Sequence, residues 1–78
     1  MDNTFKISDS EAAKIIAEKL TASFELLGET ILLVNRTCSA DDAQAYRQRV
    51  GDAFYTITFK LLEPIYAQHP MLKPTDWT

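Results

Sequence analysis

The residues best suited to chemistry are a set of carboxylates, one histidine and one cysteine. Glu18, Glu25 and Glu29 follow one another at spacings of seven and four, which puts them on one face of a helix. Carboxylates grouped in this way can bind a metal or exchange protons. Di-iron helical bundles also require Glu-x-x-His motifs, and the sequence contains none. The pattern therefore favours a solvated acidic face.

The single histidine and single cysteine have no supporting motif. His69 stands between Gln68 and Pro70, at the expected end of a helix, so we expect its imidazole either to cap the negative end of the helix dipole or to lie at the surface. Cys38 stands near Arg36 in an expected turn, and it has no cysteine with which to form a disulfide within the chain. One histidine and one cysteine cannot make a zinc cluster. The sequence predicts no catalytic residue, no metal and no cofactor.

Composition indicates a folded, mildly acidic protein. The chain has 78 residues, is 46% hydrophobic and 24% charged, and carries a net charge of −3. This charge argues against nucleic acid or an anionic membrane as a partner, since both attract basic surfaces. No apolar run approaches the ~18 residues of a membrane span, and the first residues do not resemble a secretory signal. We therefore expect a soluble, cytoplasmic protein with a single domain, 1–78.

Two long helices must position these residues. The capping-box pattern Ser8-Asp9-Ser10-Glu11 predicts a first helix over about 8–34, with Ser8 as its cap. Residues 35–38 read as a turn, and Ser39 is the natural cap of a second helix over about 40–68. Both segments carry apolar residues at spacings of three and four, which is the helical period. A short connection between long helices predicts an antiparallel hairpin.

The second helix and the tail contain the interruptions. Pro64 removes one backbone N–H group, so we expect a kink near Glu63 followed by about one more turn. The tail, 69–78, is expected to be irregular and to lie back on the helices, because it carries the large apolar residues Met71, Leu72 and Trp77.

Each helix has a second apolar stripe that one neighbouring helix cannot cover. We take these stripes as a candidate interface, made of Ile15, Leu26 and Leu33 on the first helix and Tyr55, Phe59, Leu62 and Tyr66 on the second. A second copy, the folded-back tail or a foreign protein could cover them. A chain this short gains much from added core, so the sequence favours two copies that pack as a four-helix bundle.

The function predicted from these features is a non-enzymatic protein–protein interaction or regulatory module that acts as a homodimer. A variant of this function is an acidic inhibitor whose glutamate face covers a basic partner. The alternative is a ligand-binding or enzymatic protein whose site forms at the dimer interface, near Tyr55, Glu63, Tyr66 and His69. A partly polar pocket that unites these residues would favour the alternative.

Overall fold

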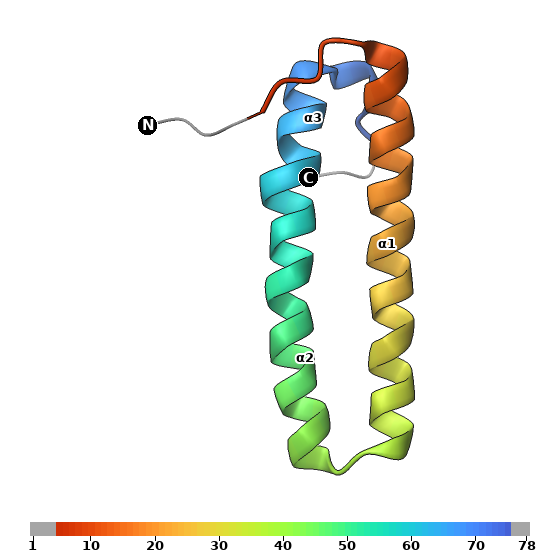
Figure 1. Ribbon diagram of the computed structural model, residues 1–78, viewed down its shortest axis with the longest axis vertical. Coiled ribbons are helices and arrows are strands. Elements are labelled where there is room, and N and C mark those ends of the chain that lie inside the picture. The colour runs from red at the N-terminus through yellow and green to blue at the C-terminus, as the bar shows by residue number, and fades with distance from the viewer. Residues whose placement is uncertain (1–4, 76–78) are drawn as a thin grey trace.

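Two long helical arms lie side by side in the computed structural model, which describes residues 5–75 (Figure 1). The first arm is α1, Ser10–Thr37. The second arm consists of α2 (Ala40–Tyr55), the π-helical segment η1 (Thr56–Leu62) and α3 (Glu63–Gln68) in direct succession. A short 3-10 helix, η2 (Pro70–Leu72), follows. Within residues 5–75 there is no strand, which confirms the predicted all-α hairpin for this part of the chain.

Helix α1 begins two residues later and ends three residues later than the sequence predicted. Its cap is Asp9 rather than Ser8, because the Asp9 carboxylate accepts hydrogen bonds from the N–H groups of Glu11 and Ala12. The expected turn at residues 35–37 is the last turn of the helix. There Asn35 accepts a hydrogen bond of 2.8 Å from the Arg47 guanidinium of α2, and this contact holds the two arms together at the turn.

The connection between the arms is short. Cys38 ends α1 with its N–H donating to the Val34 carbonyl oxygen at 2.9 Å. Ser39 then caps α2, as predicted, and its hydroxyl accepts from the Asp42 N–H at 3.2 Å. Two residues between helices leave α2 no room except beside α1, in the opposite direction.

Pro64 does not break the second arm. The irregularity lies before it, in η1, where the Glu63 N–H donates to the carbonyl oxygen of Thr58, five residues back. Proline lacks an N–H group and its ring crowds the carbonyl four residues earlier, so a wider turn just upstream relieves a conflict that an α-helix would retain. The arm remains helical from Ala40 to Gln68, within the predicted limits.

The π turn changes which residues face α1. A π turn holds one residue more than an α turn, so it rotates the following positions by about 100°. Leu62 and Tyr66 consequently become buried, whereas Leu61, which the α-helical pattern places on the core face, is only half-buried. Ile65 is completely buried between them.

The most buried part of the protein lies at the end of the hairpin opposite the turn, where α3 lies beside the first turns of α1 (Figure 1). Ala13 and Ala17 of α1 pack there against Leu62, Ile65 and Tyr66. Partly buried hydrophobic residues complete this core: Phe5, Ile7, Leu20, Ile57 and Leu72. Two alanines form the buried α1 side of this contact, whereas Ile16, which follows Ala13 by three residues in the same helical pattern, is exposed. Small residues allow the two arms to approach closely.

Fewer groups hold the middle and the turn end of the hairpin. The rings of Phe24 and Phe54 stack with their centroids 4.2 Å apart. The hydroxyl groups of Thr30 and Tyr46 form a hydrogen bond of 2.7 Å between the arms. In this part of the described chain only Ala43 and Val50 are buried.

Gln68 and His69 bind the N-terminal segment to the end of the second arm. The Gln68 side-chain amide accepts from the Ile7 N–H and donates to the Phe5 carbonyl, both at 2.9 Å. His69 Nε2 lies 2.6 Å from the Ile7 carbonyl oxygen. Because a carbonyl can only accept, Nε2 carries a proton and donates. His69 therefore lies at the end of α3, as expected, but it is a buried structural residue, so the surface alternative is wrong.

Replacing Gln68 with alanine is expected to release this segment. The Ile7 N–H and the Phe5 carbonyl lose their partner, and the loss of two part-buried hydrogen bonds lowers the free energy of unfolding by about 1–2 kcal/mol. Hydrogen exchange followed by NMR should show the Ile7 amide losing its protection. Gln48→Ala, at an exposed position of α2, is the matched control and should change neither quantity. Unchanged exchange at Ile7 in Gln68→Ala would contradict the contact.

The tail behaves as predicted only in part. Leu72 packs against the core, but Met71 points outward with 75% of its surface exposed. Trp77 lies outside the described residues.

Candidate protein interface

The outer face of α1 carries three exposed apolar side chains. Ile15, Leu26 and Leu33 are 45%, 61% and 53% exposed. Their spacings of eleven and seven residues place them within about 20° of one another around the helix axis. The half-buried residues that face the second arm, such as Leu27 and Ile31, lie about 100–160° away from them. The three side chains therefore point away from α2, as an unpartnered stripe.

A second exposed apolar group lies on the other arm. Tyr55 ends α2 and Phe59 lies one turn later in η1, with ring centroids 4.9 Å apart. Both side chains are more than half exposed. The two rings shield each other on one side only, so they remain available to a partner.

The structure divides the predicted aromatic stripe in two. Tyr55 and Phe59 are on the surface, but Leu62 and Tyr66 are only 4% and 6% exposed because the π turn rotates them towards α1. Contacts within one chain cover these two residues, so they belong to the core and not to a free surface. Of the seven predicted interface residues, five remain exposed.

Periodicity missed two further exposed residues of α1, Ile16 and Leu32. Leu32 is exposed beside Leu33, within the apolar run of residues 31–34. The helical spacing places Leu33 in the outer stripe but does not assign Leu32, because all four residues of the run are apolar. In the structure Ile31 and Val34 are half-buried, whereas Leu32 and Leu33 are exposed.

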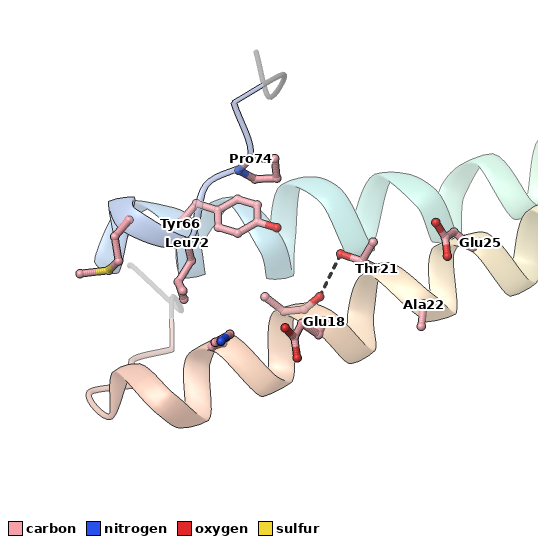
Figure 2. Close-up of a pocket in the computed structure, with 10 residues that line it drawn as sticks. Glu18, Thr21, Ala22, Glu25, Tyr66, Leu72 and Pro74 are labelled. Carbon is pink, nitrogen blue, oxygen red and sulfur yellow. Dashed lines mark hydrogen bonds between the residues drawn. The ribbon is translucent and has the colours of Figure 1, made fainter.

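An open pocket of about 480 Å³ lies between α1 and the segment 66–74 (Figure 2). Glu18, Thr21 and Glu25 line it from α1, and Tyr66, Leu72 and Pro74 close the opposite side. The dashed line in Figure 2 joins the Thr21 hydroxyl to the Ala17 carbonyl oxygen at 2.9 Å, a bond within the helix.

Within one copy of the chain, the residues of the alternative site predicted from the sequence do not line a single pocket. Tyr66 borders the pocket, but neither Tyr55 nor Glu63 lines it. His69 is occupied by its bond to Ile7. Tyr55 lies on the outer surface. Glu18 and Glu25 share the pocket wall without the third member of the predicted acidic face, Glu29.

Other candidate groups are simple to place. Cys38 is exposed in the turn between the arms, with its sulfur 3.6 Å from the Thr37 hydroxyl. Among residues 5–75, no three His, Cys, Asp or Glu side chains gather in a way that could hold a metal ion. No helix in this range combines the length and the apolar character needed to cross a membrane.

Fold and surface together define a class: a small all-α helical hairpin that leaves apolar side chains exposed on both arms. Comparison of the chain with protein-family models, with curated proteins and with solved structures finds no significant match. The functional argument therefore rests on the chain's own residues.

Proposed function

We propose that this protein is a non-enzymatic protein–protein interaction module that acts as a homodimer. The observation that carries the proposal is the exposed apolar surface on both arms, above all Ile15, Leu26 and Leu33 on the outer face of α1. Aligned apolar side chains on one helix face are typical of surfaces that pack against another helix. A regulatory or scaffolding role fits a small helical chain of this kind.

The limited core of this chain would gain stability if a partner covered the exposed apolar side chains. The core holds few fully buried residues, and Ile65 is the largest side chain that is completely buried among the described residues. A small domain with a limited core is only marginally stable by itself. Covering a half-exposed leucine or isoleucine contributes on the order of 1 kcal/mol. The entropy lost on association offsets part of this gain, so we expect a dimer that dissociates on dilution.

Molar mass in solution tests the proposal. In light scattering across a concentration series, the weight-average mass is expected to rise from 8.8 kDa towards twice that value as the concentration increases. The variant Leu26→Glu places a charge on the outer face of α1 and should shift this rise to higher concentration. Gln48→Glu, on an exposed part of α2, serves as the control and should not. A mass that stays at 8.8 kDa throughout the series would contradict the homodimer.

A further inference from the structure

The exposed stripe on α1 belongs to a longer regular pattern. Six exposed residues follow one another at alternating spacings of four and three: Ile15, Lys19, Ala22, Leu26, Glu29 and Leu33. This 4-3 alternation is the spacing of the a and d positions in a coiled coil. The pattern spans eighteen residue steps, or about 27 Å of helix at 1.5 Å per residue. It lies on the face of α1 turned away from the second arm, so it is a seam separate from the hairpin's own core.

When two copies of this seam lie antiparallel, the residues that meet are complementary. The positions pair about a point between Ala22 and Leu26, so that reversing the seam brings an isoleucine to a leucine, a lysine to a glutamate and an alanine to a leucine. An antiparallel pair of helices sets a positions against d positions in the same way. Two-fold symmetry then makes every contact twice, as an isologous interface requires.

We infer that α1 packs antiparallel against α1 of a second copy of this chain, with Lys19 opposite the partner's Glu29 at both ends of the seam. In this register Ile15 meets the partner's Leu33, and Ala22 meets the partner's Leu26. The inference rests on the proposed homodimer and specifies its surface. It gives a layered order of helices in which the two α1 helices are central and the two second arms are outside, in place of a closed four-helix bundle.

Charge decides between the two possible orientations. A parallel pair would set Lys19 against the partner's Lys19, and Glu29 against the partner's Glu29, both of which are repulsive. The antiparallel pair replaces them with two attractive contacts. Packing agrees, because a small alanine opposite a large leucine fills a layer evenly along the two-fold axis. One contact opposes the arrangement: Glu25 flanks the centre of the seam and faces the partner's Glu25.

The self-complementary order also favours a second copy over a foreign helix. A foreign partner would need only a matching stripe on its own surface. Binding to such a partner would not require residues at one end of the seam to be complementary to residues at the other end. In this chain all three pairs of seam residues, two apolar and one charged, are complementary in the same antiparallel register.

Charge reversal tests this register. Lys19→Glu sets glutamates against glutamates in the homodimer, and Glu29→Lys sets lysines against lysines. Each variant is expected to weaken dimerisation about tenfold at low salt, since two exposed attractive pairs become two repulsive ones. An equimolar mixture of the two variants should recover the wild-type affinity, because a mixed dimer restores two Lys–Glu contacts. High salt should reduce all these differences.

Two controls keep the result specific. Lys60→Glu and Glu63→Lys make the same changes of charge at exposed positions of the second arm, away from the seam, and should leave the dissociation constant unchanged. Circular dichroism should show that every variant keeps its helix content, because Lys and Glu have similar helix propensities.

Each outcome is decisive. The antiparallel seam is supported if each single variant dimerises more weakly than the wild type and the mixture of the two variants recovers the wild-type affinity. A wild-type dimer whose affinity neither Lys19→Glu nor Glu29→Lys lowers would overturn the seam but keep the homodimer, with Tyr55 and Phe59 as the next surface to test. The seam also fails if Lys60→Glu weakens the dimer as much as Lys19→Glu does. A wild-type chain that is monomeric at every concentration overturns both the seam and the proposed function.

Discussion

Replacing Ile65 with alanine is expected to lower the free energy of unfolding by about 2–5 kcal/mol. Ile65 is completely buried and packs in the cluster that joins α3 to Ala13 and Ala17 of α1. Removing its branched side chain loses the transfer free energy of three carbon atoms and leaves a cavity among residues that cannot all move inward. A loss of this size is a large fraction of the stability of a 78-residue protein.

Urea denaturation followed by circular dichroism measures this effect at one fixed protein concentration, because a dimer would make stability depend on concentration. Ile65→Val should lose only about 0.5–1.5 kcal/mol and so remains measurable if the alanine variant is too unstable. Met71→Ala, at a side chain that is 75% exposed, is the control and should change stability little. Equal effects at positions 65 and 71 would mean that the core does not lie at this end of the hairpin.

The adjacent leucines of η1 give the second large effect. Leu62→Ala is expected to cost about 2–5 kcal/mol, whereas Leu61→Ala should cost roughly half as much. Leu62 is 4% exposed and belongs to the core cluster, whereas Leu61 is only half-buried. Both residues are leucines in the same segment, so differences of helix propensity cancel and the comparison reports burial alone.

This pair of variants tests the π turn directly. An uninterrupted α-helix would continue the stripe of Val50, Phe54 and Ile57 to Leu61, and Leu61→Ala would then be the more destabilising change. The opposite order of effects supports the rotation of about 100° that one additional residue introduces. Urea midpoints of the two variants, measured side by side, give the order without extrapolation to water.

The same rotation bears on the proposed interaction surface. By turning Leu62 and Tyr66 into the core, η1 leaves Tyr55 and Phe59 as an isolated pair on the second arm. The continuous exposed stripe is then the one on α1, where Ile15, Leu26 and Leu33 recur along most of the helix. A long stripe can pack against another helix over many turns, which is the physical reason for placing the dimer contact on α1.

The sequence alone determined the features that depend on neighbouring residues. Periodicity at spacings of three and four predicted two helices, Ser39 predicted the second cap, and the short turn predicted a hairpin. The limits of α1 were less well predicted, because Ser8, Asp9 and Ser10 are all acceptable caps and only the observed geometry selects Asp9.

Only the tertiary structure decided the features that depend on residues far apart. The hydrogen bonds from Gln68 and His69 to residues 5–7 join positions 61–63 residues apart, and no local pattern predicts such contacts. The burial of Leu62 and Tyr66 follows from a π turn that a fixed period of 3.6 residues does not include. Local propensity determines that a helix forms, but packing against a second element determines which of its faces is covered.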